Sequence, residues 1–312
     1  MRTLMFGNGI NLLNDYSTWS DLLTRIDDRS EPRIPNTLQY EAEVLSLPER
    51  EDAEVSYNGD GVLYNGQRFF YSIHTESKIK SMIASAMKDY HGNEVYDRIA
   101  SLPYFTHYLT TNYDQVLQST LTKYGYTEYE HIKVENTYSL RRRHSFQNDA
   151  LIQKHIWNIH GEIAFPQTIM LGLHQYCGSV GKISDLLNGK YTFNVEKKEV
   201  SVPPLQERLN VPELVPFSWI DLFFTTDVFI LGFGLQYEET DIWWLLTRRK
   251  RMRRQGIKIK NTIFFIAAIP PGKRKVLETM DVVVVEPPRE YVEKHNYFAL
   301  YMWALDFVEY HH

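Results

Sequence analysis

The chain has 312 residues, a formal net charge of −5 and 43% apolar residues. These values are typical of a folded globular protein. They exclude an intrinsically disordered chain and give no overall attraction to nucleic acid. The single cysteine, Cys177, excludes a disulfide framework and a four-cysteine zinc site.

The cysteine count and the hydropathy also predict the cellular setting. We expect Cys177 to be a buried apolar thiol in a reducing compartment. No stretch reaches the roughly 18 consecutive apolar residues of a spanning helix, and the first residues predict a strand in place of a leader. The sequence therefore predicts a cytoplasmic protein that does not enter a membrane.

The first elements follow the pattern of strand, turn and helix. An apolar run over Thr3–Phe6 predicts a strand that Gly7 and Gly9 end, and apolar residues then recur at helical spacing from Asn11 to Leu23. From about Pro32 to Pro48 prolines interrupt the pattern.

The next segment predicts a small insertion. Residues Val55–Ile73 alternate in polarity around two Asn-Gly turn signals, which indicates an antiparallel hairpin. Ser77–Tyr90 is amphipathic at the helical period and predicts a helix that returns the chain to the main sheet.

The remaining strands are short apolar runs that are continuous and do not alternate. Such strands are typical of a parallel sheet covered on both faces, so we predict a doubly wound, Rossmann-like α/β fold with a small β-hairpin/helical insertion. We expect one domain over 1–312, an inserted subdomain over 30–100, and a helical insertion with a loop over the site at 175–216. The five runs are Tyr104–Leu109, His155–Ile159, Val228–Leu231, Thr262–Ala267 and Val282–Val285.

The first glycine-containing turn suggests a phosphate-binding loop. Gly7, Asn8, Gly9 and Asn11 follow the first strand, where backbone N–H groups and a positive helix end can hold a pyrophosphate. Leu12 stands where the common dinucleotide fingerprint has its third glycine. Taken alone, the glycines also fit simple turn geometry and Asn11 an ordinary helix N-cap.

Polar residues that can act in chemistry follow two later strands. Thr110, Asn112 and Asp114 come directly after one strand, and His160 with Gly161 follows the next. Ligands bind at strand carboxyl ends in open α/β sheets, where an amide and a carboxylate can orient a ribose and an imidazole can move a proton. By themselves, Asn112 and Asp114 are equally compatible with an ordinary turn.

A second glycine turn follows the strand Val228–Leu231. Gly232 and Gly234 let the backbone approach the adenosine half of a dinucleotide, or simply let the strand bend. Asp241, in the acidic stretch that follows, is expected to be a helix-end residue rather than a ligand contact.

In this order and context, the segments GNGIN, TTNYD, IHG and GFGL resemble the conserved motifs of the sirtuin superfamily. The resemblance covers the sheet core and not the insertions. It implies that Asn112 and Asp114 contact the nicotinamide ribose of NAD, and that His160 acts as a base. The implied catalytic residues are Asn112 and His160, the implied nucleotide-binding residues are Gly7, Asn8, Gly9, Asn11, Thr110, Asp114, Gly232 and Gly234, and no metal ligand is expected.

Two departures separate the chain from deacylating sirtuins. One cysteine cannot build their cysteine-rich zinc module, so no zinc is expected, and Phe233 and Leu235 flank Gly234 where a serine-containing turn is usual. The sequence is more similar to the sirtuin-like NAD hydrolases of bacterial antiphage defence. Its opening segment also resembles that of bacterial abortive-infection proteins, more weakly.

The resemblance implies an NAD+ hydrolase that releases nicotinamide and ADP-ribose, restrained until a trigger acts. The alternatives are ADP-ribosyl transfer and a non-catalytic nucleotide-sensing subunit. The implied partners are NAD, a second copy of the chain and another defence protein.

Other charged and histidine residues are predicted to have simpler roles. Arg248–Arg254 and the loop Arg141–His144 are expected to form solvated basic surfaces, with nucleic-acid binding as the alternative. His107, His155 and His174 are expected to be packing or surface residues.

Overall fold

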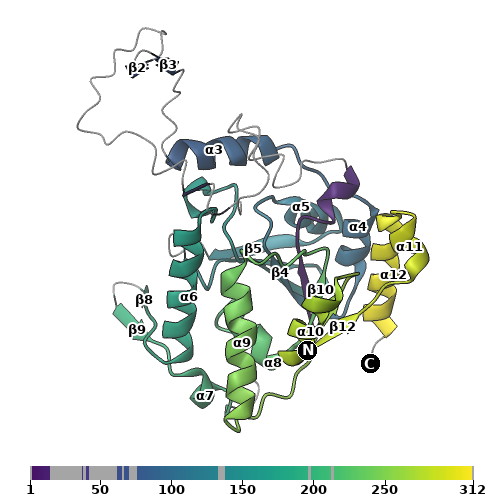
Figure 1. Ribbon diagram of the computed structural model, residues 1–312. Helices are drawn as coiled ribbons and strands as arrows, with labels where there is room; N and C mark the ends of the chain where they lie inside the picture. Colours follow the sequence, from purple (N-terminus) through teal and green to yellow (C-terminus); the bar gives the residue numbers. More distant parts are fainter. Residues whose placement is uncertain are drawn as a thin grey trace.

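The computed structural model describes residues 2–14, 37, 40–41, 62–64, 67–69, 76–132, 138–195, 198–211 and 214–310. Its centre is an eight-stranded sheet with helices on both faces (Figure 1). The strand order is β12-β11-β10-β1-β4-β7-β6-β5. The strands are β1 (Arg2–Phe6), β4 (Phe105–Thr110), β5 (Thr127–Ile132), β6 (Arg143–Gln147), β7 (Gln153–Asn158), β10 (Asp227–Leu231), β11 (Ile263–Ile266) and β12 (Val282–Val285).

Six of these strands are parallel, and they are the six that the apolar runs predict. When these six strands are numbered in chain order, their order across the sheet is 3-2-1-4-5-6, which is the Rossmann arrangement. The predicted fold class is therefore confirmed. The strand order reverses between β1 and β10, so the switch point lies where these two strands end.

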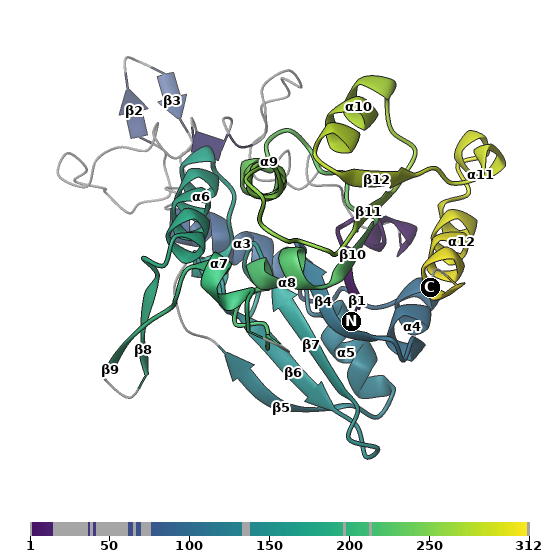
Figure 2. The same cartoon turned by 90° about the horizontal axis from the view of Figure 1, so that it is seen from below.

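Two helical layers cover the sheet (Figure 2). Leu4 and Phe6 of β1 pack into the layer of α4, α5 and α12, whereas Met5 packs into the layer of α6, α7, α8 and α9. This alternation follows from the pleat of the strand. The helices are α4 (Glu94–Ser101), α5 (Val116–Lys123), α6 (Leu173–Leu187), α7 (Leu205–Arg208), α8 (Trp219–Thr225), α9 (Thr240–Arg254) and α12 (Tyr297–Tyr310), with α3 (Glu76–Met87), α10 (Pro271–Thr279) and α11 (Arg289–Glu293) beyond them.

Where the structure describes the inserted segment, its hairpin and helix match the predicted elements. β2 (Val62–Tyr64) and β3 (Gln67–Phe69) form the antiparallel hairpin expected within Val55–Ile73, and α3 corresponds to the expected helix. A second hairpin, β8 (Thr192–Val195) with β9 (Lys198–Ser201), was not expected. The division into 30–100 and 175–216 remains a prediction.

The first helix is shorter in the described residues than the sequence predicts. A 3₁₀ turn, η1, covers Asn11–Asn14, and the rest of the predicted helix to Leu23 lies outside the described residues. No helix in the described part of the chain is both long and apolar enough to span a bilayer.

The solvated basic loop predicted at Arg141–His144 is wrong in part, because only Arg141 and Arg142 lie outside regular secondary structure. Arg143 begins β6, which pairs antiparallel with both β5 and β7. Arg142 is 1% exposed, and Arg141 lies over the Phe193 ring at 3.8 Å. These cations are held by aromatic and acidic groups distant in sequence, so the local sequence gave no sign of their burial.

Cys177 also differs from its prediction, because it lies on the exposed side of α6. The basic end of α9 is partly internal as well. Arg249 is fully buried and donates to the carbonyl oxygen of Phe223 at 3.0 Å, while Lys250 donates to Asp281 at 2.5 Å. These contacts fix the end of α9, and nucleic-acid binding by its outer arginines remains a prediction.

The two glycine turns contact each other at the switch point. The Gly9 N–H donates to the Gly232 carbonyl oxygen at 2.8 Å, and a Cβ on Gly9 would lie 2.7 Å from that oxygen. Gly232 itself has a φ of +62°, which side-chain-bearing residues rarely adopt. The backbones can approach this closely only because both positions are glycine.

Candidate functional site

The site lies at the carboxyl ends of β1, β4, β7 and β10. Thr110 and Asn158 are register partners in β4 and β7, and the Ile159 N–H continues the pairing to the Thr110 carbonyl oxygen at 2.9 Å. Asn112 and His160 are each two residues beyond this pair. The fold therefore brings them to neighbouring strand ends on one edge of the sheet.

Asn11 is at the centre of a buried network that joins the first turn to the middle motif. Its Nδ2 atom donates to Asp114 Oδ2 at 2.7 Å and to Asn8 Oδ1 at 3.0 Å. Its Oδ1 atom accepts from the Tyr96 hydroxyl at 2.7 Å. Tyr96 in turn accepts from Asn112 Nδ2 at 3.5 Å, so one phenol connects both asparagines.

Asp114 organises this network. Its Oδ1 atom accepts the N–H of Val116 at 3.0 Å, at the start of α5, while its Oδ2 atom binds Asn11. Burial raises the pKa of the Asp114 carboxyl, and these hydrogen bonds act in the opposite direction. Both oxygens therefore have protein partners, and the carboxylate holds Asn11 in one orientation.

His160 is paired with a carboxylate that the sequence did not assign to the site. Its Nε2 atom lies 3.0 Å from Asp241 Oδ2, and both residues are at most 1% exposed. Ser179 on α6 donates to the same oxygen at 3.1 Å. An acidic partner on one ring nitrogen fixes the tautomer and leaves the other nitrogen, Nδ1, for proton transfer.

The second ring nitrogen of His160 faces another acid. Nδ1 lies 3.6 Å from Glu239 Oε2, which is beyond hydrogen-bond length. Burial raises the pKa of Glu239 to about 7. For His160, burial lowers the pKa, but Asp241 and Glu239 outweigh it and the pKa is raised. His160 is thus a stronger base than a free imidazole.

Neighbouring groups hold the His160 turn in place. The Tyr176 ring on α6 meets the imidazole edge to face, with centroids 5.1 Å apart. The His160 carbonyl oxygen accepts from the Met170 N–H at 2.9 Å, and Gly161 has a φ of +104°. The turn is therefore held by Tyr176 of α6, by the Met170 segment that precedes α6, and by a backbone conformation at Gly161 that favours glycine.

The glycine turns do not offer all their N–H groups to a ligand. The Gly9 N–H is already donated to Gly232, so it is not free for a phosphate as the sequence suggests. In the late turn, Lys273 Nζ donates to the carbonyl oxygens of Gly234 and Leu235 at 2.6 and 2.7 Å. A lysine therefore lies beside the predicted adenosine contacts.

Buried polar groups at this edge lack protein partners. Asn158 is 1% exposed, yet neither amide atom makes a hydrogen bond within the described residues. Glu239 Oε2 and Thr240 Oγ1 are also without such bonds there. Buried polar atoms are almost always satisfied, so this edge fits a polar ligand such as a nucleotide.

The predicted residues thus divide into two adjacent groups. Asn11 binds Asn8 and Asp114 and is linked to Asn112 through Tyr96, whereas His160 belongs with Asp241 and Glu239. No hydrogen bond in the described part of the chain joins Asn112 to His160 directly. Thr110 supports the first group, because its Oγ1 atom accepts the Asn112 N–H at 3.0 Å.

The sequence analysis did not single out Tyr96 or Ser179, and it placed Asp241 at a helix end without a role beside His160. Tyr96 and Ser179 are ordinary helical residues without a local signal. Asp241 does begin a helix as predicted, but it also contacts His160 across 81 positions of sequence. Its place just after a glycine turn at a strand end was the one available clue.

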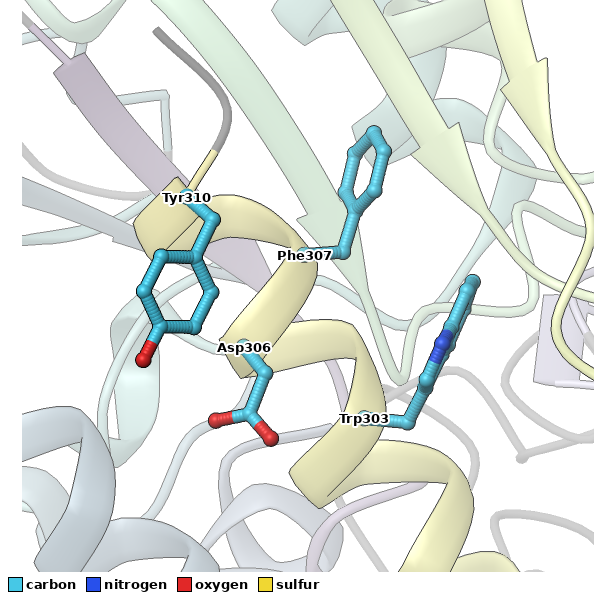
Figure 3. Close-up of a pocket in the computed structure, with 4 residues that line it drawn as sticks. All are labelled: Trp303, Asp306, Phe307 and Tyr310. Carbon is cyan, nitrogen blue, oxygen red and sulfur yellow. The ribbon is translucent and has the colours of Figure 1, made fainter.

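The pocket drawn in Figure 3 is elsewhere on the molecule. It is an open hollow of about 400 Å³ beside Trp303, Asp306, Phe307 and Tyr310, all on α12. This end of α12 lies near the start of β1, where Arg2 donates to the Val308 carbonyl oxygen at 3.1 Å. The hollow therefore lies near the amino ends of the parallel strands, whereas the site lies at their carboxyl ends.

The raised pKa of His160 predicts how stability changes with pH. The folded state holds this proton more tightly than the unfolded chain, whose histidine titrates near about pH 6.5. The stabilisation is therefore complete below about pH 6.5 and is lost as the pH rises through the folded pKa. The raised pKa of Glu239 acts in the same direction.

Urea unfolding of the wild type and of a His160→Gln variant, at several pH values between about 6 and 9, isolates this effect. We expect the stability difference between the two proteins to shrink as the pH rises. A difference that stays constant or grows would contradict the proposed protonation of His160.

Two comparisons with known proteins bear on this arrangement. A family model described as a SIR2-like domain matches residues 106–285, which include β4 from its second residue and all of β7, β10, β11 and β12. The matched range also contains Asn112, Asp114, His160 and Asp241. No curated protein matches the chain.

Proposed function

The chain belongs to the SIR2-like domain family, whose members use NAD as a substrate, and from this we propose that it is an NAD+ hydrolase that releases nicotinamide and ADP-ribose. The observation that carries the proposal is the buried His160–Asp241 pair at the strand ends beside the Asn11–Asp114 network. A protein that only held the nucleotide would not need a buried histidine whose basicity is raised.

The chemistry requires little beyond positioning and charge. The nicotinamide of NAD+ is cationic, so it can leave without a general acid, and the barrier is an oxocarbenium-like ribosyl centre. Four acidic residues, Asp114, Glu238, Glu239 and Asp241, lie in the segments that follow β4 and β10. Negative groups close to the ribose would lower the cost of the developing positive charge.

Each residue then has a distinct task. Asn112, held by Tyr96 and Thr110, orients the ribose and the attacking water. His160 accepts a proton through Nδ1 from that water or from a ribose hydroxyl, while Asp241 holds the other nitrogen. Asp114 holds Asn11 in place, and its carboxylate supplies negative charge at the same strand end.

The overall reaction consumes one water. The bond between ribose and nicotinamide breaks with both electrons going to nicotinamide, water adds to the ribosyl carbon, and its proton passes by way of His160 to solvent. No metal or second cofactor takes part in this scheme. Asn158 and Thr240 offer further hydrogen bonds to the bound nucleotide.

NAD labelled in its adenosine half tests the proposal. The purified protein is incubated with it, and nicotinamide is measured by chromatography alongside the fate of the label. Hydrolysis predicts equal amounts of nicotinamide and free labelled ADP-ribose. Label bound to a macromolecule would instead favour ADP-ribosyl transfer, and binding without turnover, even with a cell extract present, would favour a nucleotide sensor.

We also propose that the activity is regulated and serves antiphage defence by abortive infection in the cytoplasm. Unrestrained loss of NAD would harm the host, so a second copy of the chain or a partner defence protein would hold the enzyme inactive. Measuring cellular NAD in bacteria that express the protein, before and after phage infection, tests this. A fall in NAD confined to infected cells with intact His160 is expected, and an unchanged NAD level would contradict it.

A further inference from the structure

A second cluster of histidines and carboxylates lies on the antiparallel edge of the sheet. His131 in β5 and His144 in β6 are direct cross-strand partners, and their rings stack with centroids 3.7 Å apart. Directly opposite residues on one sheet face have adjacent side chains. The hairpin therefore presents two imidazoles together on one face.

A β-bulge adds a carboxylate to the same face. Glu128 and His131 are three positions apart, so in a regular strand their side chains would point to opposite faces. The register shift between Glu128 and Glu130 removes this difference. As a result, Glu128 Oε1 reaches His144 Nδ1 at 2.8 Å, while Glu130 pairs with Arg143 at 2.9 Å.

A buried carboxylate from another part of the chain holds both imidazoles. Glu162 is fully buried, and its two oxygens lie 2.8 Å from His144 Nε2 and 3.2 Å from His131 Nε2. Metal-binding histidines commonly donate their second ring N–H to such a carboxylate, which fixes the ring and raises the basicity of the metal-binding nitrogen. With Nε2 anchored, Nδ1 is the ring nitrogen that each histidine can offer to a metal ion, and on His144 this atom contacts Glu128.

We propose that Glu128, His131 and His144 form a binding site for a divalent transition metal of the zinc type. Their ligand atoms lie within 4.8 Å of one another. Two imidazole nitrogens and one carboxylate oxygen form an open three-ligand set, with a fourth position for water. Histidine and carboxylate residues supply this set, so it is independent of the cysteine-rich module that the sequence rules out.

To accept the ion, the Glu128 oxygen must move and the His131 ring must turn out of its stack with His144, so that both imidazole planes point at the metal. Ligands at the usual zinc distances are about 3.3 Å apart in a tetrahedral site, so the Glu128 oxygen must move slightly away from His144. The Glu128 side chain is 40% exposed and can move, whereas Glu162 and His144 are buried and stay in place.

A proton competes with the metal for this position. An imidazole nitrogen binds either a proton or a metal ion. Metal binding must displace that proton. Zinc affinity should therefore increase with pH, a dependence that an exposed acidic patch would not show.

The site is next to the proposed catalytic turn, since Glu162 follows His160 and Gly161 in the chain. The Glu162 N–H also donates to Thr168 Oγ1 at 3.1 Å, within the segment that packs on Gly161. An ion on the hairpin would thus stiffen the turn that carries His160.

Zinc binding by the full chain tests the proposal. Chelator-treated protein is titrated with Zn²⁺ by calorimetry near about pH 7.5, and thermal melts with and without Zn²⁺ confirm that each variant folds. We expect one ion per chain, with binding lost in His131→Ala and in Glu128→Gln. Glu162→Gln should weaken it about 10–100-fold.

The matched control is His155→Ala. His155 stacks on His107 with centroids 5.0 Å apart, but it lacks the shared carboxylate, so its removal should leave zinc binding unchanged. The second candidate set, His160 with Glu239 and Asp241, is tested by His160→Ala. No binding to the wild type, or binding that survives His131→Ala and disappears in His160→Ala, would overturn the proposal.

Discussion

His160→Ala is expected to slow nicotinamide release from NAD by about 10²–10⁴-fold, the usual contribution of a general base. Asn112→Ala should cause a comparable loss, since the amide orients the ribose and the water. Rates of nicotinamide formation at saturating NAD measure both effects.

The control for these variants is His174→Ala, because the His174 side chain is exposed on the first turn of α6 and no hydrogen bond among the described residues joins it to the site. Its rate should equal that of the wild type. Full activity in both His160→Ala and Asn112→Ala would reject the assigned roles.

The Asp241→Asn variant tests whether Asp241 acts through His160, by orienting the imidazole and raising its pKa. Asp241 raises the pKa of His160, so removing its charge should lower that pKa and shift the rise of activity with pH to more acidic values. A variant that is merely destabilised would lose activity at all pH values without moving the profile.

Of the substitutions proposed, Gly161→Ala is expected to lower the free energy of unfolding the most. Gly161 has a φ of +104°, and a Cβ there would lie 2.7 Å from the Ile169 Cα atom and overlap the Thr168 carbonyl. Backbone strain alone costs about 1–3 kcal/mol, and the overlap adds to it. We therefore expect the free energy of unfolding to fall by about 3 kcal/mol or more.

Gly181→Ala is the matched control. Gly181 lies inside α6, and a Cβ there would meet no atom within 4 Å. This variant should gain up to about 1 kcal/mol of stability, because alanine favours the helix. Equal stabilities for the two variants in urea unfolding would contradict the structure around Gly161.

The sequence was sufficient to predict the six parallel strands of the central sheet. Runs such as Ile263–Ile266 are apolar throughout because helices cover both faces, and this pattern is readable without knowledge of tertiary contacts. The antiparallel edge strand β5 was not predicted, because it has no continuous apolar run. Thr127–Ile132 is polar and never fully buried, so nothing in it distinguishes a strand from a loop.

The site was only half predictable, because its two groups depend on different kinds of contact. Asn112, Asp114 and His160 follow apolar strands, so their position at one sheet edge could be inferred. The partner of His160 could not, since Asp241 reaches it from a separate crossover. The hydrogen bond between Gly9 and Gly232 was equally hidden, because it depends on the strand order.

The central claim is that Asn112 and His160 act on one ribose. A crystal structure of the His160→Ala variant soaked with intact NAD tests it most directly, because the variant should cleave the bound nucleotide slowly enough for the intact form to be captured. We predict the nicotinamide ribose within hydrogen-bonding distance of Asn112 Nδ2, with its reactive carbon facing the space left by the imidazole. A ribose that contacts neither position would contradict the proposed hydrolysis.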